Sequence, residues 1–327
     1  MRYLVWLTVL LIILGAVPTM AEDGDGGWAG AFYYVPIGAR PAAMGGAYLA
    51  VSDDGAGPLY NPAGLANITN IRFATAYRLM KLDRQLGYAT FVVPTRGNSA
   101  LGVHYLYAGD KGLKARDTNG RELGWEINKN DHDFSVFFAK RFEKLFAVGI
   151  KANYLHATFA EMSAFTVSFD FGAMLYLSEL VDREKRDLVP IQDIQVGLTV
   201  RRIGAKYRWT NEDYLAKYTT SALSSEQDDT IPWEIGLGGA ALFFDRKLLV
   251  AADILKNIKQ SPFLHAGAEY RLYPEFAVRG GYSDGRLTAG TGYLFRLAGK
   301  TITIDYAFST DKADEGSEHI FSFDLLY

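Results

Sequence analysis

Asp53 and Asp54 are the most chemically suggestive neighbours in this chain, because paired carboxylates can perform acid–base catalysis. Gly55 follows them directly, so a turn explains these residues more simply. The five histidines are scattered without the spacing of metal ligands, at His104, His132, His156, His265 and His319. The chain has no cysteine nucleophile, and no serine stands in a nucleophile elbow. We therefore expect no enzyme, no metal site and no cofactor.

Three glycine-containing stretches resemble ligand-binding loops but lack the required context. Residues 298–301 (AGKT) end like a phosphate-binding loop, yet Leu294 stands where that loop needs its first glycine. Residues 236–239 (GLGG) lie within an expected strand, where close backbone packing explains them. Residues 23–26 (DGDG) lack the glycine and glutamate positions of a calcium loop. The net charge of −3 gives no reason to expect nucleic acid as a partner.

Alternation of apolar and polar residues is the dominant pattern from residue 71 onward, and it predicts strands. Residues 165–177, for example, place Phe, Val, Ala and Leu on one face and Thr, Ser and Asp on the other. About fourteen strands are expected, at 71–79, 85–94, 99–108, 131–141, 144–157, 163–178, 191–203, 231–243, 247–257, 262–272, 274–283, 285–298, 299–309 and 318–327. Their even number and length indicate an all-β fold, a transmembrane antiparallel β-barrel over residues 71–327. A soluble β-sandwich is the alternative, but its strands would be shorter.

The last strand ends on an apolar face formed by Phe321, Phe323, Leu325 and Tyr327. An open edge with such side chains would invite aggregation, so we expect this strand to pair with the first and close the barrel. The bilayer of the outer membrane and the assembly machinery of that membrane are the partners that this implies.

Strand parity also fixes which charged side chains point inward, since an arginine or lysine facing mid-bilayer lipid costs roughly 2–4 kcal/mol. The expected inward set is Arg72, Arg78, Lys151, Asp170, Arg201, Glu234, Asp253, Glu269, Arg271, Arg279, Arg296 and Asp305. Both signs are present, which favours pairing within a wet lumen over a selectivity ring for a polar solute.

The N-terminus predicts export. Arg2 precedes an apolar run at 3–14, and small residues end at Ala21, so residues 1–21 are expected to form a signal peptide. A retained anchor is the alternative, and the absence of cysteine excludes lipoprotein processing. We expect the mature protein in the outer membrane of a Gram-negative type bacterium. Its outward connections would include two long polar loops, 109–130 and 204–230, and residues 179–190 would form an unusually long charged periplasmic turn.

Residues 22–70 have a different texture from the barrel. Residues 22–27 are polar, and residues 37–68 are rich in Gly, Ala and Pro. The latter segment is too broken for a lipid-facing strand and too apolar for a free tail, which predicts burial inside the lumen. Asn61 and Pro62 would cap and begin a turn or short helix. An N-terminal strand pair is the alternative.

Four short motifs in this segment resemble the N-terminal signature of the PorV/PorQ family of outer-membrane proteins, which is related to the FadL-type long-chain fatty acid transporters. The motifs are Gly38-Ala39-Arg40, Met44-Gly45-Gly46-Ala47, Ser52-Asp53-Asp54 and Asn61-Pro62-Ala63-Gly64-Leu65. The resemblance implies that residues 22–70 hold a polar linker and a hatch that plugs the barrel. The hatch residues carried over are Gly45, Gly46, Asp53, Asp54, Asn61, Pro62, Ala63 and Gly64.

Two functions follow from the resemblance. The first is the passage of a small hydrophobic molecule across the outer membrane, with the hatch moving around Gly55, Gly57 and Gly64. The second is a non-conducting barrel that binds cargo or secreted partner proteins in a type IX-like secretion system. Aromatic residues in the expected outer loops could form that binding surface, at Trp125, Tyr207, Trp209 and Tyr214.

Overall fold

The structure is a computed structural model that describes residues 28–81, 83–117, 119–180, 191–210, 226–283, 285–310 and 316–327. The expected signal peptide at 1–21, the polar stretch at 22–27 and Tyr214 lie outside the described residues. So does most of the charged turn, because residues 181–190 are not described.

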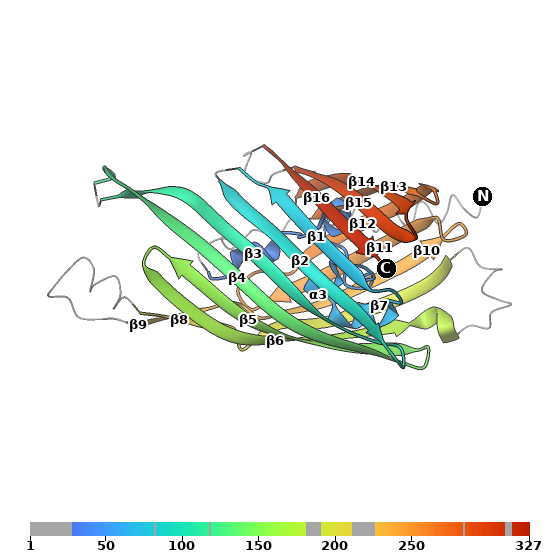
Figure 1. The fold of residues 1–327 in the computed structure, drawn as a ribbon. Coiled ribbons are helices and arrows are strands. Elements are labelled where there is room, and N and C mark those ends of the chain that lie inside the picture. The colour runs from blue at the N-terminus through green and yellow to red at the C-terminus, as the bar shows by residue number, and fades with distance from the viewer. Residues whose placement is uncertain are drawn as a thin grey trace.

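Within the described residues, fourteen antiparallel strands close into one barrel (Figure 1). They are β1 (Arg72–Leu79), β2 (Arg84–Thr95), β3 (Ser99–Arg116), β4 (Glu122–Phe142), β5 (Phe146–Phe159), β6 (Met162–Tyr176), β7 (Ile191–Ile203), β10 (Glu234–Phe243), β11 (Leu248–Asn257), β12 (Phe263–Tyr273), β13 (Phe276–Ser283), β14 (Arg286–Leu297), β15 (Lys300–Thr310) and β16 (Ser317–Leu326). Each overlaps one of the expected strands, so the predicted fold class is confirmed.

The barrel closes where β1 pairs with β16. Phe321 lies opposite Tyr77, Phe323 opposite Thr75 and Leu325 opposite Phe73. Phe321 is exposed on the outer face, and Tyr327 follows the strand, donating its backbone N–H to the Ile71 carbonyl oxygen at 2.9 Å. Closure leaves neither strand with an open edge, which removes the aggregation hazard.

The wall has an apolar outside and a polar inside, as the alternation requires. On the outer face, Phe165 is 67% exposed and Val136 is 59% exposed. On the inner face, Lys151 and Asp170 are buried and lie 3.6 Å apart. Most of the expected inward charges are buried in this way, whereas Arg271 and Arg296, near the ends of their strands, are exposed.

The two expected long outer loops are wrong in part. Residues 109–130 are mainly strand, because β3 and β4 continue past the rim as a two-stranded ribbon. Residues 204–230 contain a further hairpin of β8 (Lys206–Thr210) and β9 (Glu226–Thr230). These strands were not predicted because their sequences are charged. Beyond the bilayer, cross-strand ion pairs such as Arg116–Glu122, at 2.9 Å, can replace an apolar face.

Residues 28–68, which we call the luminal segment, run inside the barrel (Figure 1). Their helical turns are η1 (Ala31–Tyr34), α2 (Ala39–Ala43), α3 (Gly57–Tyr60) and η2 (Pro62–Asn67), and a further turn, η3 (Leu177–Leu180), follows β6. Helix α2 contacts β13 to β16, and η2 contacts β3 to β6. No helix in the described ranges is both long and apolar enough to cross a membrane.

Candidate functional site

The turn at Asn61 is built as its sequence predicts. The Asn61 side-chain oxygen accepts a hydrogen bond from Ala63 N at 3.0 Å, and Pro62 occupies the first turn of η2. The side-chain amide donates to the carbonyl oxygens of Leu49, at 2.9 Å, and Ala173, at 3.1 Å. One fully buried side chain therefore caps η2, holds the preceding turn and reaches the β6 wall.

Two wall glycines make room for this turn. Gly149 on β5 and Gly172 on β6 lie directly opposite each other. A Cβ atom on Gly149 would overlap the backbone of Pro62 and Ala63, and one on Gly172 would overlap the Asn61 side chain. Backbone and side-chain atoms of the luminal segment thus occupy the space of two missing side chains, and we call such a place a glycine socket.

A second glycine socket holds Leu49. Gly197 on β7 faces Gly238 on β10, and Gly236 lies two residues along. A Cβ on Gly197 would overlap the Leu49 carbonyl, and one on Gly238 would lie 2.8 Å from the Leu49 Cβ. The expectation that 236–239 serves close packing is confirmed for Gly236 and Gly238, whereas Gly239 faces open space.

A third glycine socket receives the Gly45–Gly46 turn. Gly267 on β12 faces Gly281 on β13, and a Cβ on either would overlap the backbone at residues 44–45. Gly45 and Gly46 have φ of 63° and 83°, which disfavour other residues. His265 fixes the turn, because its Nδ1 lies 2.6 Å from the Gly45 carbonyl oxygen.

Asp53 and Asp54 both bind the same arginine. Arg40 Nη1 lies 2.5 Å from Asp53 and 3.3 Å from Asp54. The Tyr48 hydroxyl donates to Asp54 at 2.5 Å. Burial alone would lower the pKa of the Arg40 guanidinium, but Asp53 and Glu269 raise it well above its ordinary value, so Arg40 stays charged.

The same arginine joins the luminal segment to the wall. Arg40 Nε lies 2.7 Å from Glu269 on β12, which also lies 2.7 Å from Arg279 on β13. Arg279 in turn pairs with Asp305 on β15 at 2.6 Å. We call these four residues the Arg40 network. Three strands and the luminal segment are thus linked through ion pairs.

The glycines expected to act as hinges are tightly packed. A Cβ on Gly57 or Gly64 would strike the Ser52 carbonyl, and one on Gly55 would overlap Ala74 of β1. None of the three has a left-handed backbone. In this conformation they permit close approach, and their hinge role stays a prediction.

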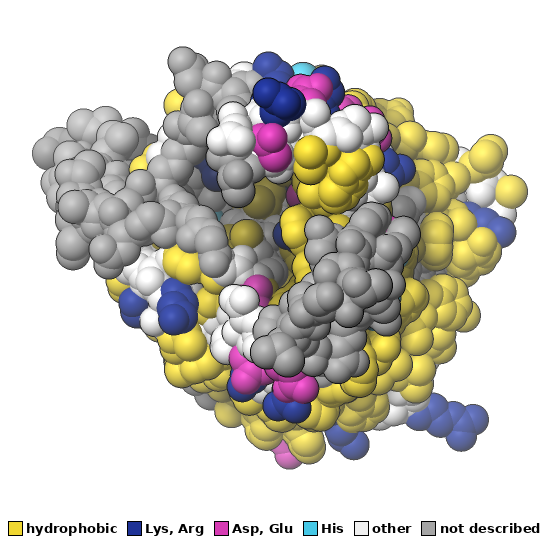
Figure 2. All heavy atoms as spheres, turned by 90° about the vertical axis from the view of Figure 1, so that its left-hand side faces the viewer, with side chains coloured by type: hydrophobic (Ala, Val, Ile, Leu, Met, Phe, Trp, Pro, Cys, Tyr) yellow, Lys and Arg dark blue, Asp and Glu magenta, His cyan; other side chains and the backbone are white. Residues whose placement is uncertain are grey.

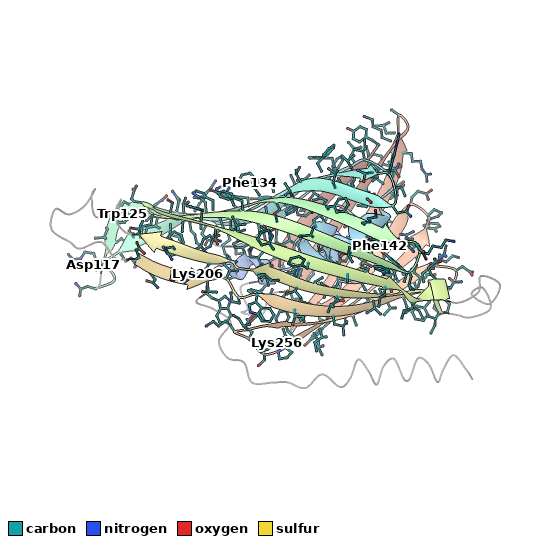
Figure 3. All side chains as sticks on the ribbon, turned by 90° about the horizontal axis from the view of Figure 1, so that it is seen from below. Asp117, Trp125, Phe134, Phe142, Lys206 and Lys256 are labelled. Carbon is teal, nitrogen blue, oxygen red and sulfur yellow. The ribbon has the colours of Figure 1, made fainter. Side chains whose placement is uncertain are left out.

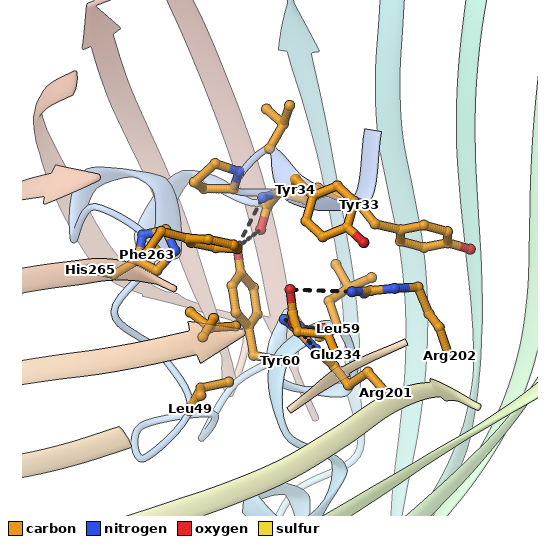
Figure 4. A pocket seen from close by; sticks show the side chains of 15 residues that line it. Tyr33, Tyr34, Leu49, Leu59, Tyr60, Arg201, Arg202, Glu234, Phe263 and His265 are labelled. Carbon is orange, nitrogen blue, oxygen red and sulfur yellow. Dashed lines mark hydrogen bonds and ion pairs between the residues drawn. The ribbon is translucent and has the colours of Figure 1, made fainter. Parts of the chain in front are cut away.

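Between the luminal segment and the barrel wall lies a small cavity of about 40 Å³, which we call the aromatic cavity (Figure 4). Tyr33, Tyr34, Tyr60 and Phe263 contribute rings to its lining, together with several aliphatic side chains. The Tyr60 hydroxyl accepts from Ile37 N at 2.9 Å and donates to Ile37 O at 3.0 Å. Burial raises the pKa of Tyr60, so this hydroxyl stays neutral.

A β-bulge brings two arginines to one side of this cavity. The β6–β7 register shifts between Phe169 and Phe171, and Arg202 has a left-handed φ of 61°. Arg201 and Arg202 consequently both face inward and share Glu234, with contacts of 3.0 Å and 3.3 Å. The Arg202 guanidinium also lies 5.0 Å from the centre of the Tyr34 ring.

The barrel end that carries the ribbon, which we call the mouth, has an apolar inner side. Leu123, Trp125 and Ile127 continue the inward parity of β4, and Phe159 continues that of β5. Trp125 is 40% exposed and Phe159 is 38% exposed. Seen from this end, the molecule is hollowed and hydrophobic side chains lie within the hollow (Figure 2). Trp125 and Phe142 mark the two ends of β4 (Figure 3).

The opposite end opens into a larger polar space of about 680 Å³, which we call the turn-end hollow. Arg40, Asp53 and Glu269 line it, with Arg141 and Arg246 near the short turns. Ala50 and Val51 of the luminal segment also line it, whereas Leu49 lines the aromatic cavity. The luminal segment therefore separates an aromatic space from a charged one.

Several solved structures resemble this chain over almost their whole length. The CymD monoaromatic hydrocarbon channel has a TM-score of 0.61 at 13% identity, covering 90% of this chain and 97% of that chain. A TodX deltaS2S3 mutant, also a monoaromatic hydrocarbon channel, has a TM-score of 0.60 at 12% identity, with coverages of 88% and 97%. A FadL homologue of Pseudomonas aeruginosa has a TM-score of 0.54 at 14% identity, with coverages of 94% and 98%. No protein-family profile and no curated protein matches the sequence. The chain thus has the fold of FadL-type outer-membrane barrels.

Sequence reasoning missed two parts of this site. Arg202 was not among the expected inward charges, because the bulge reverses the parity of β7 after Arg201. The glycine sockets were also missed, although glycine at inward positions of successive strands, such as Gly149 and Gly172, is a signal that could have found them.

Proposed function

We propose that this protein is an outer-membrane channel through which a small hydrophobic molecule passes, and that the luminal segment is its hatch. The observation that carries the proposal is an apolar path. Exposed inward-facing rings at the mouth form its first part, and an aromatic cavity between the luminal segment and the wall forms its second part, with polar wall residues such as Asp133 and Lys151 between them.

Capture at the mouth is the first step. Trp125, on the ribbon beyond the rim, and Phe159, at the rim, offer exposed rings at inward-facing positions, where a dissolved hydrophobic molecule can leave water. Burial of apolar surface contributes about 25 cal/mol per Å², so a small ring gains a few kcal/mol there. Such weak binding suits a site from which the molecule must move on.

The aromatic cavity is the second step. Its Tyr and Phe rings would accept a small planar molecule, and the guanidinium of Arg202 can lie against a π face. At about 40 Å³ it holds only a few water molecules in this conformation, so Tyr34 or Phe263 must move to admit a ring. The monoaromatic hydrocarbon channels with this fold support a ligand of that class.

We also propose roles for residues 1–70. Residues 1–21 would direct export, and residues 22–70 would form the linker and hatch of a PorV/PorQ-type member of the FadL-like group. In this reading Gly45, Gly46, Asn61 and the Asp53–Asp54 pair hold the hatch in place.

Uptake into proteoliposomes tests the proposal. Protein reconstituted with its mouth outward should accelerate the entry of toluene or of a radiolabelled fatty acid relative to empty vesicles. Trp125→Ala and Phe159→Ala should each lower the initial rate about fivefold, since one ring contact is worth about 1 kcal/mol. Phe138→Ala, which removes a ring from the lipid-facing wall, is the matched control and should leave the rate unchanged. Wild-type rates equal to those of empty vesicles would refute passage.

The ribbon supports a second candidate, a binding platform for secreted proteins. Leu123 and Trp125 are exposed beyond the barrel wall, and the other face of the ribbon carries Lys114, Arg116 and Glu122. A non-conducting component of a type IX-like system would bind its cargo there. Co-purification of a secreted protein that is lost on Trp125→Ala, with no uptake by the wild type, would favour this function.

A further inference from the structure

We infer that Asp253 is a latch that holds the constriction between the aromatic cavity and the turn-end hollow, a step that rests on the proposed passage through the lumen. Asp253 lies on the inner face of β11 and is 2% exposed. It belongs to the wall, and what it binds is backbone of the luminal segment.

The contact is a clamp on two successive backbone amides. Asp253 Oδ2 accepts from Tyr48 N at 2.6 Å and from Leu49 N at 2.8 Å. These amides begin a turn whose Val51 and Ser52 N–H groups both donate to the Tyr48 carbonyl oxygen. A carboxylate that accepts two backbone N–H bonds in a buried place fixes the position of that turn.

The clamp lies where the two spaces would meet. Along the inner face of β11, Leu255 lines the aromatic cavity, Asp253 is the next inward residue, and Leu249 lines the turn-end hollow. The facing residue on β12 is His265, which binds the Gly45 carbonyl oxygen. The two wall residues therefore hold neighbouring turns of the luminal segment at the same level, Asp253 by two N–H groups and His265 by a C=O group.

The Asp253 carboxylate also has fewer partners than Glu269, another wall carboxylate that binds the luminal segment. Its Oδ1 has no hydrogen-bond partner, and no cation pairs with the carboxylate in the part of the chain that the structure describes. By contrast, Glu269 in the Arg40 network is held by two arginines. A buried carboxylate without a counter-ion is costly, so we expect this attachment to release more readily than the Arg40 network.

Release would free a local part of the luminal segment only. The glycine sockets at Asn61 and at Gly45 would still hold the segment on either side. With its two bonds to β11 lost, the turn from Tyr48 to Ser52 would keep its packing in the second glycine socket and the Asn61 bond to the Leu49 carbonyl oxygen, and it would move away from β11 more often and join the two spaces.

Amide hydrogen exchange and planar-bilayer conductance test the latch without any hydrophobic ligand. Asp253→Ala should speed exchange of amides 44–52 at least about tenfold and raise ion conductance by a similar factor, because two hydrogen bonds to a charged group are lost. Asp253→Asn keeps one acceptor oxygen, so it should give a smaller increase in both quantities. If the alanine variant does not fold, the asparagine variant decides the question.

Asn257→Ala is the matched control. Asn257 is a buried inward residue on the same strand, and it caps the loop at Lys259 and Gln260. It should leave both readouts unchanged. Unaltered exchange at 44–52 in a folded Asp253 variant, or an equal rise in Asn257→Ala, would overturn the latch. A wild type that takes up no hydrophobic solute would refute the proposed function, whereas the exchange result would still report on the clamp.

Discussion

Replacement of Asn61 by alanine should detach the luminal segment while the barrel stays intact. The substitution removes the cap on Ala63 N and the two donors to the Leu49 and Ala173 carbonyl oxygens. A lost N-cap costs about 1 kcal/mol. Each buried carbonyl left without its donor costs about another 1 kcal/mol at the low end. The sum of about 3 kcal/mol predicts local opening that is about a hundred times more frequent.

Hydrogen exchange resolved by segment is the assay, because it separates the luminal segment from the wall. Amides at 49–66 should lose protection, while the β5 and β6 ladder keeps it, since the ladder does not depend on Asn61. Asn61→Asp retains the cap acceptor but lacks both donors and adds a buried charge, so it should be at least as damaging.

Asn67→Ala is the control within the same helical turn. Asn67 is half-buried at the end of η2, where it donates to the Tyr176 hydroxyl. It should change exchange far less than Asn61→Ala. Equal effects of the two substitutions, or global loss of protection across the barrel, would refute the reasoning that Asn61 is a local anchor.

Three further substitutions follow from the same geometry. Gly238→Val should destabilise the folded barrel in heat-dependent gel shifts, whereas Gly239→Val, on the outer face with open space around it, should not; equal shifts would contradict the glycine sockets. Glu269→Gln leaves Arg40 buried with weaker partners and should cost about 3–5 kcal/mol in urea unfolding, and a loss below about 1 kcal/mol would show that the Arg40 network is dispensable. Val136→Arg puts a charge on the lipid-facing wall and should cost about 2–4 kcal/mol in lipid vesicles but little in detergent, so an equal loss in both would place Val136 outside the bilayer.

The strands could be predicted from sequence because lipid and lumen place opposite demands on alternate residues. Phe165 and Val136 had to face out and Lys151 and Asp170 had to face in, and the structure agrees. Beyond the rim, lipid and lumen no longer require apolar and polar residues to alternate. The ribbon at 109–130 therefore carries charge on both strands and was mistaken for a loop.

The site was harder to predict, since it depends on register and on one irregularity. That Gly149 faces Gly172 follows only from how β5 and β6 pair. The bulge at Arg201 and Arg202 reverses the inward–outward alternation from which the inward-facing charges were predicted. No nearby residue in the sequence indicates this bulge. Asn61 was the exception, because a cap is encoded by neighbouring residues.

The glycine sockets constrain how the molecule can be made. The residues that fill them belong to the stretch just before β1, while the sockets lie on β5, β6, β7, β10, β12 and β13. Only four residues separate the end of η2 at Asn67 from the start of β1 at Arg72, so the plug is tethered to one edge of the sheet. If the barrel closed first, the luminal segment would have to enter it from one end, although it packs closely against the interior of the wall. We therefore expect the sheet to wrap around the luminal segment, and β1 to pair with β16 last.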